Sequence, residues 1–309
     1  MPILHKTSSN YDFTVKTVPV FAQNPNTGEF ERTGTYCNQK QEDGSIVGPM
    51  VSKRYKIADN AQVVSHARNA LLSKGLNPDA AEFTARGCEN DSRWHFQWDW
   101  KDQTIQLPQV GDKLGLRLSV QNSFDRKLKV AFRLGMLRLI CLNGMTTLEN
   151  EFALSKKHNG SLNLGFMGQA LEDALDAFSP EKAGAVFSRL ADLKITQEQG
   201  LTILQNFVED VSGFSERTRS RVSEIWNAPT HEEDSDRNLY NLYNATTQFL
   251  THDVNPERVE MAEKLNRNVL VTLNQATVAG AGRELNRLWT PREPEAVTSE
   301  VQEDALELN

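Results

Sequence analysis

The segment from Arg93 to Trp100 constrains the fold of this 309-residue chain more than any other part of it. Its aromatic residues occupy even positions and its polar residues occupy odd positions, in the order RWHFQWDW. A strict period of two predicts a β-strand with one buried face, because successive side chains of a strand point to opposite sides. We therefore interpret the four aromatic residues as part of a core rather than as a stacking platform for a ligand.

Two later segments, residues 114–120 and 128–136, repeat this alternation and are separated by a turn-forming sequence. Three sequential strands joined by short turns predict an antiparallel meander, and its even-numbered face should pack on a helix over residues 60–74. The alternation breaks after Gly135, where Arg138 would fall on the apolar face. A β-bulge at Gly135 would repair it.

The first fifty residues predict a few short strands with long connections, and residues 53–57 predict a strand that leads into the helix. From Gly168 onward the apolar period is helical, and Ser179-Pro180 and Thr196–Gln199 are helix-start signals. The sequence thus predicts an α+β fold: an N-terminal antiparallel β-meander packed on a helix, then a mostly α-helical half and a disordered acidic tail. The expected parts are an α+β domain with a basic β-hairpin (1–165), a helical region (166–290) and the tail (291–309).

Charge is unevenly distributed along the chain, whose formal net charge is −7. The segment from Asp112 to Arg138 has seven basic and two acidic residues, a local charge of +5. Residues 291–309 have six acidic residues and one basic residue, a local charge of −5. This last segment has no apolar stripe, so we expect it to be disordered and to be a candidate for recruiting a protein partner.

Several classes of protein are disfavoured by the sequence. It has no apolar run of about 20 residues and no secretory signal, and its three cysteines are far apart, which suits a reducing cytoplasm. Its six histidines lack metal-ligand spacing, and the acidic run after His231 is typical of an exposed loop. No nucleophile elbow or phosphate-binding loop is present. We therefore predict no metal site, cofactor or catalytic residue, which disfavours an enzyme without excluding one.

The basic hairpin is the best candidate binding site. A sheet that presents cations can hold a single strand of nucleic acid by neutralising phosphates and stacking bases. The alternative is a solvated sheet face whose charges pair with acids of the helical half. The predicted nucleic-acid-binding residues are Arg117, Arg126, Lys127, Lys129 and Arg133.

Three motifs resemble those of a bacteriophage and plasmid family known as domain of unknown function 932. They are the segment Ser52–Ile57 ahead of a helix, the block Asn122-Ser123-Phe124-Asp125 followed by Arg138–Met145, and the segment Asn238–His252. One departure is Arg126, where members of the family often have glycine. The resemblance implies a phage or mobile-element origin and a location in the host cytoplasm, but it implies no reaction.

The motifs contain polar residues within or beside apolar elements, and buried polar groups need partners. These family-motif residues are Asn122, Asp125, Arg138, Asn143 and Asn244. They could hydrogen-bond to one another as structural residues, or form a ligand site where the motifs meet. We expect the guanidinium of Arg138 to be buried against a carboxylate, with Asp125 as the candidate.

The first functional hypothesis is a non-enzymatic accessory protein that binds single-stranded nucleic acid in replication or recombination. The meander with its helix loosely resembles the β-β-β-α core of single-strand annealing proteins, which is an analogy of fold alone. The alternatives are a host-takeover or structural protein that acts through protein–protein contacts, and an enzyme of an unrecognised class. The oligomeric state is not determined by the sequence.

Overall fold

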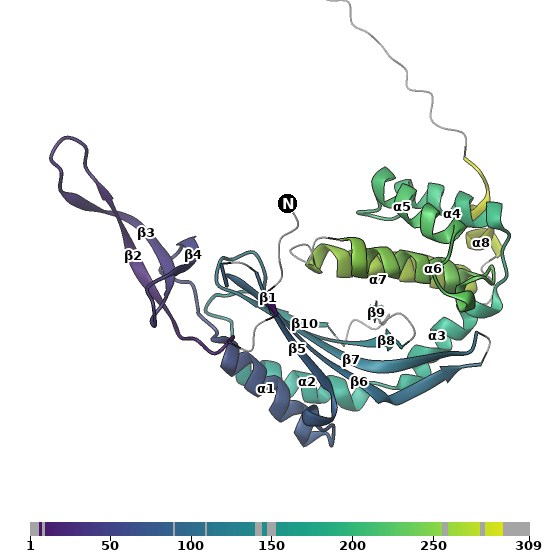
Figure 1. Ribbon diagram of the computed structural model, residues 1–309, viewed down its shortest axis with the longest axis horizontal. Coiled ribbons are helices and arrows are strands. Elements are labelled where there is room, and N and C mark those ends of the chain that lie inside the picture. Colours follow the sequence, from purple (N-terminus) through teal and green to yellow (C-terminus); the bar gives the residue numbers. More distant parts are fainter. Residues whose placement is uncertain are drawn as a thin grey trace, which may run out of the picture.

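The computed structural model describes most of the chain, and Figure 1 shows how the elements are arranged. The described residues are 6–7, 10–88, 90–108, 110–139, 144–146, 153–254, 259–278 and 282–292. Cys141, Asn143 and the predicted tail from residue 293 onward lie outside these ranges, so the predictions made for them stay predictions.

The main sheet is antiparallel, and its central strands follow one another along the chain. The strand order is β1-β5-β6-β7-β8-β10, and β9 pairs with the same edge of β8 as β10 does. The strands are β1 (Lys6–Thr7), β5 (Glu82–Gly87), β6 (Arg93–Leu107), β7 (Asp112–Ser123), β8 (Val130–Arg138), β9 (Gly144–Thr146) and β10 (Ala153–Lys156). Strands β6, β7 and β8 form the predicted meander.

Two helices, α1 (Asn60–Ser73) and α2 (Leu164–Ala177), cover the even-numbered face of this sheet. Val63 and Leu71 of α1 are fully buried in the same core as Trp94 and Trp98 of β6, which confirms the predicted packing. The predicted strand at residues 53–57 is wrong. This segment begins within a turn, which a hydrogen bond from the backbone N–H of Tyr55 to the carbonyl oxygen of Ser52 closes, and it connects β4 to α1 without pairing with a described strand.

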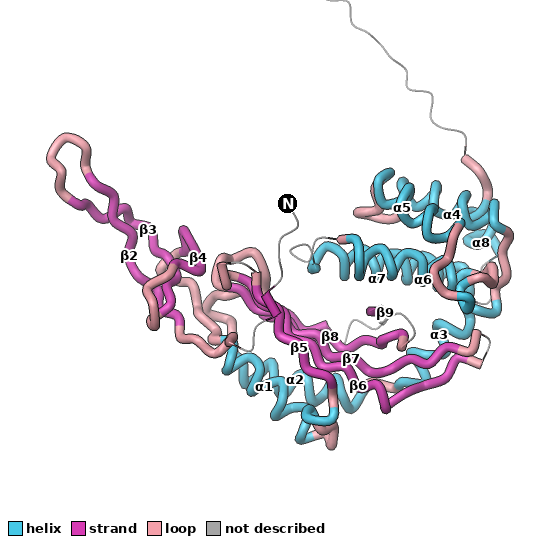
Figure 2. The backbone as a smooth tube through the Cα atoms, in the orientation of Figure 1, coloured by secondary structure: helices cyan, strands magenta, loops and turns pink. Residues whose placement is uncertain are grey.

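Residues 15–51 form a separate antiparallel sheet that projects from the rest of the chain, and we call it the arm (Figures 1 and 2). Its strands, in spatial order, are β2 (Val15–Gln23), β3 (Phe30–Lys40) and β4 (Ile46–Val51). The expectation of short strands with long connections is wrong, because β2 and β3 pair up to a tight turn in which Gly28 takes a φ of +75°. Near this turn Phe21 and Phe30 are 52% and 70% exposed.

The second half of the chain is helical, as predicted. Its helices are α3 (Pro180–Asp192), α4 (Gln197–Asp210), α5 (Glu216–Asn227), α6 (Leu239–Gln248), α7 (Val259–Thr277) and α8 (Gly282–Trp289). Both start signals are confirmed, since Ser179 caps α3 and Thr196 forms a capping box with Gln199 at the start of α4. Helices α6 and α7 lie on the opposite side of the main sheet from α1 and α2 (Figure 1).

A buried arginine, Arg138, joins the end of β8 to this helical half. Its Nε and Nη2 donate to the carboxylate of Asp112 at 2.7 and 3.1 Å, and its Nη1 donates to Oδ2 of Asp234 at 2.8 Å. Tyr240 Oη donates to Asp112 at 2.8 Å, and Asn244 Nδ2 donates to Asp234 at 3.2 Å. Burial alone would lower the pKa of Arg138, but its two carboxylate partners raise it above its ordinary value. The guanidinium therefore stays charged in the core.

Two predictions about Arg138 are wrong. Its carboxylate partners come from the start of β7 and from the helical half, whereas Asp125 lies beyond the opposite end of β7. There is no bulge at Gly135, since the register of β7 with β8 is uninterrupted, and the meander is instead irregular in β6 between Trp100 and Thr104. Arg138 remains on the same face of β8 as its apolar neighbours, because the carboxylates of Asp112 and Asp234 meet its guanidinium there.

We predict that Arg138→Met lowers the free energy of unfolding by about 3–5 kcal/mol, because two carboxylates would stay buried without their cation. Urea unfolding followed by circular dichroism measures this difference. Lys113→Met, which removes an exposed cation near the start of β7, should change the stability by no more than about 0.5 kcal/mol. An Arg138→Met variant as stable as the wild type would contradict the structural importance of the network.

Candidate nucleic-acid interface

The main sheet has one buried apolar face and one more polar face, whose residues are partly buried. The aromatic side chains of β6 are at most 2% exposed, which confirms their interpretation as core residues. The opposite face carries rows of polar side chains in register across the strands, such as Gln97, Ser119 and Arg133. These three side chains are half-buried rather than covered. The polar face therefore offers hydrogen-bonding groups but none of the aromatic residues of β6.

Two of the predicted binding residues lie on this face and are already paired with acids. Arg117 makes two hydrogen bonds to the carboxylate of Asp99, at 2.6 and 2.8 Å. Arg133 forms an ion pair with Glu263 of α7 at 2.9 Å and donates to Gln121 at 3.0 Å. For Arg133 this is the predicted alternative, in which a sheet cation pairs with an acid of the helical half. Both residues therefore contribute little uncompensated positive charge.

The other three predicted residues, Arg126, Lys127 and Lys129, lie at the turn between β7 and β8. Arg126 and Lys127 are exposed and Lys129 is half-buried. Arg126 adopts a φ of +70°, and its Nη1 donates to the backbone oxygen of Met50 at 3.0 Å. Among the described residues, none of these three cations has an ion-pair partner, so their charge is available to a ligand.

Tyr55 and His158 bring two further basic segments to this turn. Tyr55 Oη donates to the backbone oxygen of Ser123 at 2.7 Å, and the Tyr55 ring stacks on His158 with 4.9 Å between centroids and an interplanar angle of 7°. The backbone N–H of Lys56 donates to the carbonyl oxygen of His158 at 3.2 Å. Residues 53–56 and 156–158 thus lie against the β7–β8 turn.

We call the cations of these three segments the basic surface. It consists of Lys53, Arg54, Lys56, Arg126, Lys127, Lys129, Lys156 and Lys157. No ion pair is found for any of them within the part of the chain that the structure describes. The nearby carboxylate, Asp125, is paired with Arg93 at 3.0 Å. The sequence analysis did not predict the members at 53–56 and 156–157 as binding residues. Their only signal in the sequence is the two dibasic pairs Lys53-Arg54 and Lys156-Lys157.

The family-motif residues lie in two separate places. Asn122 Nδ2 donates at 2.8 Å to the backbone oxygen of Ala58 and to Oδ1 of Asn60, and with Asp125 it lies at the end of the sheet that carries the basic surface. Arg138 and Asn244 belong to the network at the other end. The described motif residues therefore hydrogen-bond within structural contacts and do not converge on one ligand site.

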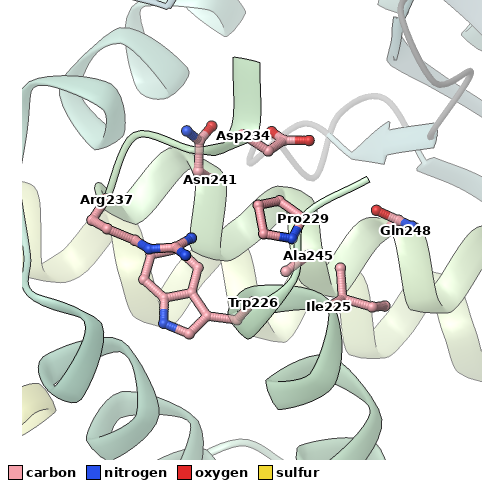
Figure 3. A pocket seen from close by; sticks show the side chains of 8 residues that line it. All are labelled: Ile225, Trp226, Pro229, Asp234, Arg237, Asn241, Ala245 and Gln248. Atoms are coloured by element: carbon pink, nitrogen blue, oxygen red, sulfur yellow. The ribbon is translucent and has the colours of Figure 1, made fainter. Parts of the chain in front are cut away.

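A small pocket in the helical half is lined by the residues drawn in Figure 3. The guanidinium of Arg237 lies over the ring of Trp226, 4.4 Å from its centroid. The pocket has a volume of about 10 Å³, room for one water molecule. The predicted exposed loop after His231 contributes Asp234, which is buried because it pairs with Arg138. No group of three or more metal-ligating side chains is found in the described ranges.

The free energy of unfolding of the chain should depend on pH through His158, which packs beside the basic surface. Nδ1 of His158 lies 3.0 Å from the carbonyl oxygen of Lys56, and burial lowers the pKa of the imidazole. The unfolded chain takes up this proton near the ordinary pKa of about 6.5, whereas the folded chain does so only at lower pH. The free energy of unfolding should therefore fall as the pH falls below about 6.5.

We predict that His158→Gln removes this part of the pH dependence. Urea unfolding at about pH 7 and about pH 5.5 measures it as the difference between wild type and variant. The same substitution at the half-exposed His231 controls for the loss of one imidazole. If wild type and His158→Gln lose equal stability over this interval, His158 does not titrate as its burial requires.

The comparisons with known proteins identify one family. A model described as a domain of unknown function (DUF932) matches residues 49–276, well over half of the chain. No curated protein and no solved structure matches the chain. Within the described residues, no helix is long and apolar enough to cross a membrane. The matched region includes all of the basic surface and the Arg138 network. The chain therefore belongs to the family of domain of unknown function 932, as its motifs predicted.

Proposed function

We propose that the chain binds single-stranded nucleic acid through the basic surface. The observation that carries this proposal is that three adjoining segments carry eight cations, none of them in an ion pair with a described residue, in a chain with a net charge of −7. A local excess of positive charge on an acidic protein attracts polyanions to that place in particular. An array of separate cations suits a ligand with regularly repeated charges, as a phosphodiester backbone has.

The proposal includes a biological setting. We infer a phage- or plasmid-encoded accessory protein that acts in replication or recombination in the host cytoplasm. The family resemblance supports this setting, and the antiparallel meander with α1 and α2 on its apolar face supports it as an analogy of fold. The proposed role is to hold a strand, and the chain's contribution is phosphate neutralisation by the basic surface.

A second candidate function is a protein–protein interaction through the arm. The arm exposes several large apolar side chains, which an interface would cover. They are Phe21, Phe30, Ile46 and Met50, each more than half exposed. Most of the arm precedes the region that the family model matches, so this candidate concerns a feature outside the matched domain.

The first test replaces three exposed members of the basic surface, Lys53, Lys127 and Lys157, with alanine. Fluorescence anisotropy with a labelled oligothymidylate, titrated at several salt concentrations, measures the affinity and its salt dependence. We predict weaker binding. The slope of log affinity against log salt concentration should decrease in magnitude by about 0.7 per lost phosphate contact, or about 2 in total.

A matched control changes the net charge equally at a distance from the basic surface. Lys113, Lys182 and Arg217 are exposed, and no ion pair is found for them among the described residues. Their triple alanine variant should bind with nearly the wild-type salt dependence. Equal losses in both variants would show that only net charge matters. Absence of wild-type binding at low salt would refute the proposed function.

A further inference from the structure

An open groove adjoins the basic surface between the first turns of α1 and α2. Its volume is about 680 Å³, within the range of about 300–1,000 Å³ typical of ligand sites. Lys56 belongs both to the groove and to the basic surface. The lining residues come from the ends of two connections and the helices that follow them: Lys56, Ile57, Ala61, Gln62, Ser65, His66, Leu162, Asn163, Leu164 and Gly165.

The groove combines apolar walls with polar side chains that have no described partner. Ile57 and Leu164 supply half-buried apolar surface. Gln62, Ser65 and His66 lie along α1, and no side-chain hydrogen bond is found for them within the described residues. A site of this kind can hold a flat, partly polar ring, with the apolar walls against its faces and the polar groups at its edges.

An exposed aromatic residue, Phe166, follows the groove residues in the first turn of α2. Its side chain is 61% exposed, and the ammonium of Lys156 lies 5.8 Å from its ring centroid. The backbone N–H of Phe166 donates to Oδ1 of the N-cap Asn163 at 3.0 Å, which fixes the start of the helix and the backbone that carries the ring. Exposed aromatic rings beside cations are the usual stacking partners of unpaired bases.

We propose that this groove takes one unstacked nucleotide of a bound single strand, with its phosphate toward Lys56 and its base reaching from the groove to the neighbouring ring of Phe166. The proposal rests on the proposed function and deepens it, because the groove would distinguish single strands from duplexes. In a duplex each base is stacked and paired, so turning one out costs the free energy of both interactions, whereas an unpaired strand can turn a base out at a lower cost.

The test uses a single-stranded oligonucleotide with one 2-aminopurine, whose emission reports on stacking and can be excited beyond the tryptophan absorption. Binding of the wild type should change this emission. In Phe166→Ala the change should be lost and the single-strand affinity should fall about tenfold, the effect expected of one lost stacking contact. The salt dependence and the duplex affinity should stay as in the wild type, because no cation is removed.

Two further variants make the result specific. Phe30→Ala removes an even more exposed ring from the arm and should leave single-strand binding unchanged. Gln62→Glu places a negative charge in the groove without removing a described contact, and it should weaken single-strand binding as Phe166→Ala does. Unchanged melting temperatures exclude unfolding as the cause.

The outcomes separate the two proposals. If Phe166→Ala and Gln62→Glu bind the single strand as tightly as the wild type, the groove is not a nucleotide site and the proposed function stands. If Phe30→Ala loses as much affinity as Phe166→Ala, the effect does not belong to the groove, and the inference falls. If the wild type binds neither single strand nor duplex at low salt, the proposed function is refuted, and so is the inference about the groove.

Discussion

A buried charge network joins the main sheet to the helical half, within the apolar core that Leu107, Leu114 and Met136 of the sheet share with the helices. Arg138 comes from the end of β8, Asp112 from the start of β7 and Asp234 from the helical half. Each of these charges would be costly to bury alone, so the three are stable only as a set. Helix α7 belongs to the same helical half, and its Glu263 meets Arg133 over the polar face of the sheet, which is a second contact between the halves.

Local sequence patterns predict the elements of this fold well and their partners poorly. The alternation ending at Trp100 and the helix start at Thr196 depend only on neighbouring residues, and both predictions are confirmed. Arg138 is recognisable as a polar residue in an apolar strand. Its partner Asp234 lies 96 residues away, however, and no local signal connects them. The bulge predicted at Gly135 failed for the same reason, since distant acids made it unnecessary.

The candidate site shows the same division. The cations of the β7–β8 turn follow from the sequence, whereas the basic surface depends on the stacking of Tyr55 on His158, two residues of distant segments. The sequence likewise places Arg117 and Arg133 on one sheet face but does not reveal that each meets an acid there. Tertiary contacts therefore decide which of the predicted cations keep an available charge, and a count of basic residues along the chain could not have done so.

The root of the arm rests directly on the turn that carries part of the basic surface. Asn38 Nδ2 donates to the backbone oxygen of Phe124 at 2.7 Å, and a Cβ added at Gly48 would lie only 1.8 Å from that oxygen. Arg126 adds its hydrogen bond to Met50. Because the backbone of Gly48 packs on the backbone of Phe124 and two side-chain hydrogen bonds join the same segments, the root of the arm is attached to the turn. The arm and the cations are therefore parts of one connected surface, and a partner that touched both would have to span the distance between them.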